Sequence, residues 1–116
     1  MKVHELSEAE QAVLLSLVGL VARADGTITD AELGVLQQLR EEIGPGRFEK
    51  ARDAAAALDG GDAILEQAAQ VTRPEARKAI YDIVVDTAAP DTIDESEADL
   101  LRKLASIWGV EAPFGD

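Results

Sequence analysis

Cysteine is absent from this chain of 116 residues, histidine occurs once, and aromatic residues make up only 3% of it. Without cysteine there is no disulfide framework, no thiolate site for zinc or an iron–sulfur cluster, and no cysteine nucleophile. With His4 as the one histidine, which we expect at the surface, there is no Ser/His/Asp arrangement for nucleophilic catalysis. We therefore expect a protein that is not an enzyme, and the lack of cysteine fits a cytoplasmic location.

Basic residues and long apolar runs are also scarce. The 11 lysines and arginines stand against 23 aspartates and glutamates, which gives a formal net charge of −12. Such a charge repels nucleic-acid phosphates and anionic lipid surfaces, and it favours cations or a protein partner with a basic surface. The longest apolar run, residues 12–22, is much shorter than the ~20 residues of a transmembrane helix and reads as a buried helix. We expect no nucleic-acid binding and no direct insertion into a membrane.

Helix-capping motifs recur along the chain. In this motif a Ser, Thr or Asp side chain accepts a hydrogen bond from the third helical N–H, and a Glu three residues later reaches back. It occurs at Ser7…Glu10, Thr29…Glu32, Thr72…Glu75 and Asp94…Glu97. Strand-like alternation of useful length is not found. The sequence therefore predicts an all-α protein, with one domain over residues 1–116.

Six helices are expected, over residues 7–24, 29–43, 47–58, 62–71, 72–89 and 94–108. Gly44-Pro45-Gly46 ends the second helix, because it combines a left-handed stop with a residue that has no N–H donor. Gly109 stops the last helix. The apolar positions that we expect this last helix to bury are Leu100, Leu101, Leu104, Ile107 and Trp108.

The chain contains an internal duplication. Shifting the sequence by 65 residues aligns residues 24–32 with residues 89–97, and Ala, Thr, Ile and Glu recur in register. The match continues into the following helices, where Leu and Gly residues align. This offset predicts two pseudo-repeated helix–loop–helix halves, each with an isoleucine, Ile28 or Ile93, that points from its loop into the core.

Each duplicated loop looks like the second half of a calcium-binding EF-hand, which places oxygens at positions 1, 3, 5, 7, 9 and 12 of twelve. In the first loop Asp25 and Glu32 fit positions 5 and 12, but Val21 and Arg23 stand where the first two carboxylates belong. The second loop fits positions 1, 9 and 12 at Asp86, Asp94 and Glu97, and it fails positions 3, 5 and 6 at Ala88, Pro90 and Asp91. Neither loop is a complete EF-hand.

What the two loops share is a concentration of acidic residues. If the duplicated loops lie side by side, their carboxylates converge, and like charges held close together cost stability unless a cation is present. Carboxylate oxygens select calcium, magnesium or manganese. Two other interpretations stay open: Glu32, Asp94 and Glu97 can serve only as helix caps, with Asp25-Gly26 an ordinary turn, or the acids can face a basic partner.

The segment Ala22-Arg23-Ala24-Asp25-Gly26-Thr27-Ile28-Thr29-Asp30-Ala31-Glu32, with Ile93-Asp94-Glu95-Ser96-Glu97 and residues 104–110, resembles the tellurite-resistance TerB family. Relatives of that family include the N-terminal region of the co-chaperone DjlA. The resemblance covers nearly the whole chain. It implies a single compact bundle of about six to seven helices with pseudo-two-fold halves, which agrees with the duplication.

The resemblance also implies a divalent metal ion held by acids of both loops. Carried over by position, the candidate metal ligands are Asp25, Glu32, Asp91, Asp94 and Glu97. The second loop departs from the family pattern, because Ala89-Pro90-Asp91 replaces the expected Ala-Asp-Gly and moves the aspartate by one residue.

We therefore expect a non-enzymatic TerB-like protein that binds calcium, magnesium or manganese and acts in stress response or as a scaffold. The alternative is an acidic adaptor that docks a basic partner without metal.

Overall fold

The computed structural model describes residues 2–24, 30–58, 60–88 and 95–110, and of these it leaves out the side chains of residues 22–24, 30–32, 88 and 95–97. This part of the chain forms six α-helices, one short 3₁₀-helix and no strand, which confirms the all-α prediction. The elements are η1 (Val3–Glu5), α1 (Glu8–Ala24), α2 (Asp30–Ile43), α3 (Pro45–Ala56), α4 (Gly61–Ala68), α5 (Pro74–Ala88) and α6 (Glu95–Trp108).

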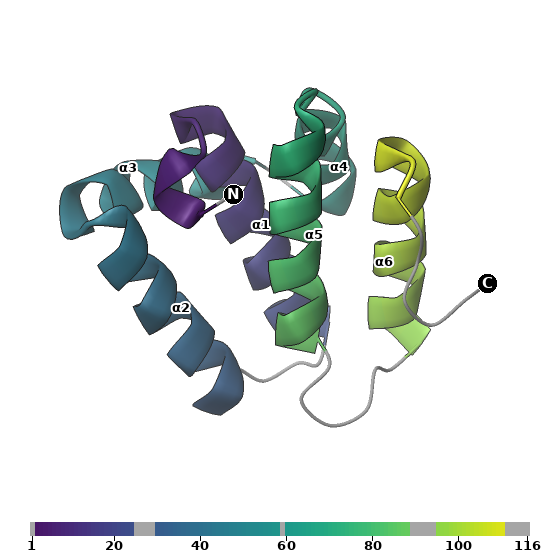
Figure 1. Ribbon diagram of the computed structural model, residues 1–116. Helices are drawn as coiled ribbons and strands as arrows, with labels where there is room; N and C mark the ends of the chain where they lie inside the picture. The colour runs from purple at the N-terminus through teal and green to yellow at the C-terminus, as the bar shows by residue number, and fades with distance from the viewer. Residues whose placement is uncertain (1, 25–29, 59, 89–94, 111–116) are drawn as a thin grey trace.

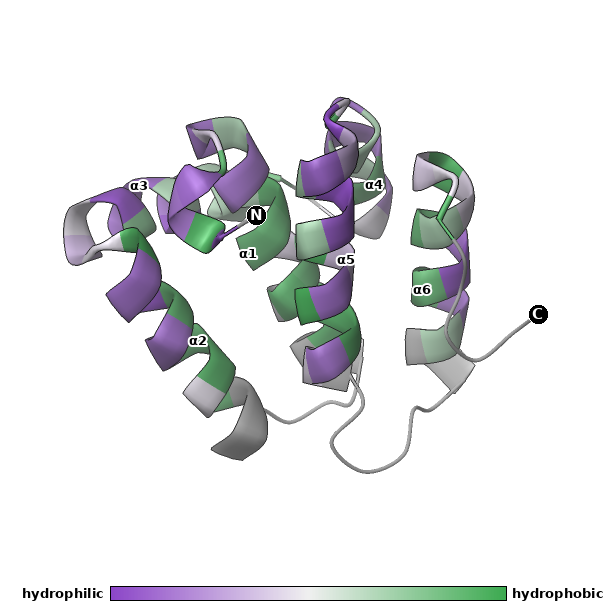
Figure 2. Cartoon of the chain, in the orientation of Figure 1, coloured by the Kyte–Doolittle hydropathy of each residue, from purple (hydrophilic) through white to green (hydrophobic). Residues whose placement is uncertain are grey.

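Helix α1 is the centre of the bundle. It contacts α3, α4, α5 and α6, and it carries the long apolar run of the sequence. Leu14, Leu17, Val18 and Val21 are fully buried on it. The prediction of a buried helix is therefore correct, and in Figure 2 hydrophobic colour covers most of the visible part of α1.

The other helices surround α1 on two sides. Helices α2 and α3 contact each other on one side, whereas α6 contacts α5 and α4 on the other. Helix α2 shows its hydrophobic residues toward α1 and α5 and its polar residues outward (Figure 2). The Cα radius of gyration of 12.9 Å is about that of a compact domain of this length.

The start of α1 confirms one predicted capping box. The Ser7 N–H donates to Glu10 Oε1 at 2.8 Å, and the Glu10 N–H donates to Ser7 Oγ at 3.1 Å. These two bonds satisfy donors that the first helical turn leaves without an intrahelical partner. For the boxes predicted at residues 29–32 and 94–97, the cap residues lie outside the described part of the chain, although α2 and α6 begin one residue after each predicted cap.

The predicted box at Thr72 and Glu75 is wrong. Helix α5 begins at Pro74, and the Arg73 carbonyl accepts the first helical hydrogen bond, from the Arg77 N–H at 3.0 Å. Arg73 is therefore the N-cap, and Glu75 stands one position too early for the reciprocal bond. Pro74 occupies the first helical position, where its missing N–H costs nothing.

Two glycines end helices as the sequence predicts. Gly44 separates α2 from α3 with φ 98° and ψ 142°, a conformation that residues with a Cβ rarely adopt. Gly109 has φ 65° after α6, and the Val110 N–H donates to the Ala105 carbonyl at 3.0 Å, which is the Schellman pattern of a helix end.

One core prediction for α6 is wrong. Ile107 is 38% exposed, whereas Ala105 is buried together with the four other predicted residues of this helix. The stripe that packs against the neighbouring helices is centred on Leu101, Leu104 and Ala105, so Ile107 falls on its edge. Val3 and Leu6 at the N-terminal end also enter the core, which the sequence pattern did not predict.

Polar side chains tie the helices together at specific points. The Trp108 Nε1–H donates to the Ala68 carbonyl at 2.7 Å and joins α6 to α4. The Tyr81 hydroxyl donates to the Leu101 carbonyl at 3.1 Å and joins α5 to α6. Burial supplies most of the stability, and these bonds add specificity to the contacts of α6 with α4 and α5.

None of the helices that the structure describes combines the length and the apolar character that a membrane span requires.

Candidate functional site

The two acidic segments of the sequence are bordered by four helix ends. These are the C-terminal ends of α1 and α5 and the N-terminal ends of α2 and α6, and all four lie at the same end of the molecule (Figure 1). Helix α1 contacts α5 and α6, and α2 contacts α5. The helix–loop–helix pairs predicted from the duplication thus stand side by side and point the same way.

Three of the five predicted metal ligands lie outside the described residues, and the other two are described by their backbone alone. The three are Asp25, Asp91 and Asp94. Glu32 and Glu97 belong to the first turns of α2 and α6, and their side chains are not described. The structure therefore describes no contact between any two of the five. Ile28 and Ile93, predicted to point into the core, also lie outside the described residues.

In the described part of the chain, histidine, aspartate and glutamate side chains do not form any group of three that could hold a metal ion.

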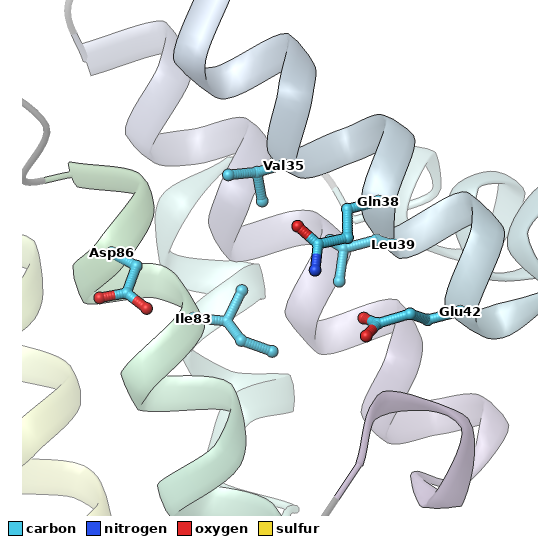
Figure 3. A pocket seen from close by; sticks show the side chains of 6 residues that line it. All are labelled: Val35, Gln38, Leu39, Glu42, Ile83 and Asp86. Atoms are coloured by element: carbon cyan, nitrogen blue, oxygen red, sulfur yellow. The ribbon is translucent and has the colours of Figure 1, made fainter.

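A cleft between α2 and α5 is the acidic feature that the structure describes directly. It has a volume of about 150 Å³. Glu42 and Gln38 enter it from α2, and Asp86 enters from α5 on the opposite side (Figure 3). The apolar remainder of the lining comprises Val35, Leu39 and Ile83. Leu39 is buried and closes the cleft toward the core.

Among the described residues, no basic side chain neutralises either carboxylate of this cleft. The ion pairs within the described residues join Arg73 to Glu10, Lys78 to Asp82 and Lys103 to Asp99. Asp86 and Glu42 are both exposed and take part in none of them. Two unpaired carboxylates beside an amide oxygen form a negative, oxygen-rich cleft, which attracts a cationic group such as a lysine or arginine side chain.

From the sequence, Asp86 was singled out only as an acid of the second loop, at EF-hand position 1, and Gln38 and Glu42 were not singled out at all. Val35, Gln38, Leu39 and Glu42 follow helical spacing on α2 and lie on one face. That face could be recognised from the sequence, but the α5 residue opposite it could not, because only the packing of α2 on α5 brings the two together.

The most strongly held carboxylate of the described chain is a structural one. Glu10 is 6% exposed, accepts a hydrogen bond from Arg73 Nε at 3.0 Å and forms an ion pair with the same guanidinium. These hydrogen bonds hold the pKa of Glu10 below its ordinary value, although burial acts in the opposite direction. Both carboxylate oxygens are occupied by Ser7 and Arg73, so Glu10 serves the fold.

Comparisons of the chain with known protein families, with curated proteins and with solved structures find no match. The fold and the charge together define an acidic helical bundle with an apolar central helix.

Proposed function

We propose that this chain is a non-enzymatic, TerB-like helical protein that binds a divalent cation between its two acidic segments and acts in stress response or as a scaffold. The observation that supports the proposal is the position of the four helix ends that border residues 25–29 and 89–94, which lie at one end of the bundle (Figure 1). Ends at opposite poles would rule out a shared site.

The helix ends also set the electrostatics of this region. The last carbonyls of α1 and α5 have no intrahelical donors and can supply neutral oxygen ligands, and their negative dipole ends favour a cation. The positive ends of α2 and α6 oppose it by a similar amount, about 0.3–1 kcal/mol for each helix. Since two positive and two negative helix ends lie at this end of the bundle, their dipoles nearly cancel, and the carboxylates determine whether a cation binds.

The proposed ligands are Asp25 and Glu32 from the first segment and Asp91, Asp94 and Glu97 from the second. Their oxygen donors suit calcium, magnesium or manganese.

A cation titration tests this proposal. Calcium or magnesium is added to the EDTA-treated protein while the amide resonances are followed by NMR. The binding of manganese is measured by calorimetry. We expect changes confined to residues 24–32 and 89–97 at millimolar ion or below. Asp25→Asn with Glu97→Gln abolishes them, whereas Glu49→Gln with Asp53→Asn on α3 removes the same charge and leaves them intact. The absence of a localised response at millimolar ion contradicts the proposal.

The cleft between α2 and α5 favours a second candidate function, an acidic adaptor that docks a basic protein partner without metal. Its support is that Asp86 and Glu42, on opposite sides of the cleft, form no ion pair with any basic side chain that the structure describes. The probe is a lysine-rich peptide. Binding that is weakened by salt and by Asp86→Asn with Glu42→Gln, but unaffected by EDTA, supports the adaptor. Binding that requires calcium or magnesium instead assigns the interaction to the cation site.

A further inference from the structure

A second cavity, between α1, α2 and α3, has a character opposite to the rest of the protein. Its volume is about 400 Å³, within the range of small-molecule pockets. Its lining comprises Leu15, Gly19, Leu33, Leu36, Gln37, Arg40, Phe48, Arg52 and Ala55. Most of these are apolar, and no aspartate or glutamate occurs among the lining residues that the structure describes, in a chain that has 23 acidic residues.

The floor of this groove is already part of the hydrophobic core. Leu15 and Phe48 are buried, and Leu36 and Ala55 pack against the core while remaining partly accessible. Leu33 extends this apolar surface outward, because it is 47% exposed. An exposed leucine that continues a buried apolar floor marks a surface that a ligand can cover.

Two arginines, Arg40 from α2 and Arg52 from α3, line the same groove. Within the part of the chain that the structure describes, neither guanidinium makes an ion pair or a hydrogen bond. By contrast, Arg47 donates to the His4 and Leu6 carbonyls, Arg77 donates to the Val71 carbonyl, and Arg73 pairs with Glu10. In so acidic a protein, two guanidinium groups that pair with no described carboxylate make this apolar groove locally positive.

We propose that this groove binds an amphipathic anion with a single alkyl chain and a carboxylate head, the chemistry of a fatty acid. The alkyl chain covers Leu15, Leu33 and Phe48, and the carboxylate accepts hydrogen bonds from Arg40 and Arg52. An anionic head group is specified by the two guanidinium groups, and a single chain by the volume. A fatty acid bound as a monomer also avoids the repulsion between an anionic bilayer and the net charge of −12.

The experiment titrates octanoate, decanoate and dodecanoate, each below its micelle concentration, into the full chain and follows amide resonances by NMR. EDTA is present throughout, so the result does not depend on the proposed cation site. We expect saturable one-site binding, with changes concentrated on α1, α2 and α3. Each added methylene tightens binding by up to about fourfold until the groove is full. Octanol, which has the same chain length as octanoate and no charge, binds at least fivefold more weakly.

Matched variants separate this site from general attraction to basic residues. Arg40→Gln with Arg52→Gln weakens decanoate binding about tenfold or more. Lys50→Gln with Lys78→Gln removes the same charge from exposed positions outside the groove and leaves binding within twofold. Leu33→Gln weakens binding, whereas Ile107→Gln, at the other exposed large apolar residue of the described chain, does not. Circular dichroism and Trp108 fluorescence verify that each variant is folded.

Three outcomes overturn the proposal. They are titration without saturation, equal losses in the arginine and lysine variants, and octanol binding as tight as octanoate binding. A further titration uses an acidic amphipathic peptide in place of the fatty acid. If this peptide shifts the resonances of the groove residues and decanoate does not, the groove binds a helical partner, and the fatty-acid proposal is wrong.

Discussion

At the scale of single residues, Glu10 is the side chain whose chemistry the structure defines most completely. Its pKa is lowered in the folded protein by the hydrogen bonds from Arg73, so the unfolded chain binds a proton more readily than the folded one. The stability that Glu10 contributes is therefore fully present above the ordinary glutamate pKa of about 4.3 and is lost as the pH falls through the lowered value.

Glu10→Gln tests this contribution directly, because glutamine preserves the capping box and removes only the charge. We expect a loss of about 1.5–3 kcal/mol in the free energy of unfolding at pH 7, the range for hydrogen bonds to charged groups. The difference from the unmodified chain shrinks as the pH drops below about 4. Ser7→Ala is the control: it removes the cap hydroxyl, costs about 0.5–2 kcal/mol and changes little with pH. Urea denaturation at several pH values measures the free energy of unfolding of both variants. If the loss caused by Glu10→Gln is unchanged at pH 3, the charge of Glu10 is not the source of its stabilising effect.

At the scale of helices, the turn between α2 and α3 depends on the backbone of Gly44. Gly44→Ala places a Cβ in a conformation with φ 98° and should cost about 1–3 kcal/mol, although no neighbouring atom lies within 4 Å of that Cβ. Gly34, inside α2, also has open space around its Cβ position, and Gly34→Ala should stabilise the protein by about 0.5–1 kcal/mol. Thermal unfolding of the Gly44→Ala and Gly34→Ala variants separates the effect of backbone conformation from that of steric contact. Melting temperatures that shift in the same direction in both variants would contradict this explanation.

The pairing of α5 with α6 depends in part on Tyr81. Burial raises the pKa of its hydroxyl, which donates to the Leu101 carbonyl. Tyr81→Phe leaves that carbonyl without its side-chain donor and should cost about 1 kcal/mol in unfolding free energy. Trp108 of α6 provides the fluorescence signal for the denaturant titration. A neutral effect would mean that the bond contributes nothing beyond burial of the ring.

Helix positions could be predicted from the sequence because their signals are local. Ser7 and Glu10 lie within one turn of each other, and Gly44 and Gly109 end helices through their own backbone freedom. The predictions fail where contacts with other residues, and not the local sequence pattern, determine the structure. Ile107 fits the helical period of α6 but lies at the edge of the packed stripe, and the N-cap of α5 moved to Arg73 because Pro74 begins that helix.

For the whole molecule, the two helix pairs that the duplication predicts have the ends that border residues 25–29 and 89–94 at one end of the bundle. The acidic cleft and the arginine-lined groove could not be predicted in the same way. Glu42 meets Asp86, and Arg40 meets Arg52, only through contacts between different helices, and a helical period carries no information about which faces oppose each other. The five proposed metal ligands remain a prediction of residue type and resemblance.

The net charge of −12 makes the stability of the whole bundle sensitive to ions. Sodium chloride should raise the melting temperature gradually, because it screens repulsion between carboxylates at every position. A bound divalent ion adds a separate contribution that depends on its dissociation constant: at 10 mM ion and a dissociation constant of about 1 mM, it stabilises the fold by about 1.4 kcal/mol. For a chain of this length that corresponds to a rise of roughly 5 °C.

Melting temperatures at equal ionic strength separate screening from binding. Magnesium or calcium chloride should exceed sodium chloride in the unmodified chain, and Asp25→Asn with Glu97→Gln should remove that excess while raising the melting temperature in sodium chloride, since two repelling charges are gone. Glu49→Gln with Asp53→Asn should keep the excess. Equal melting curves in the two salts would mean that the acids act only through their summed charge. That result would contradict the cation site and favour the acidic adaptor.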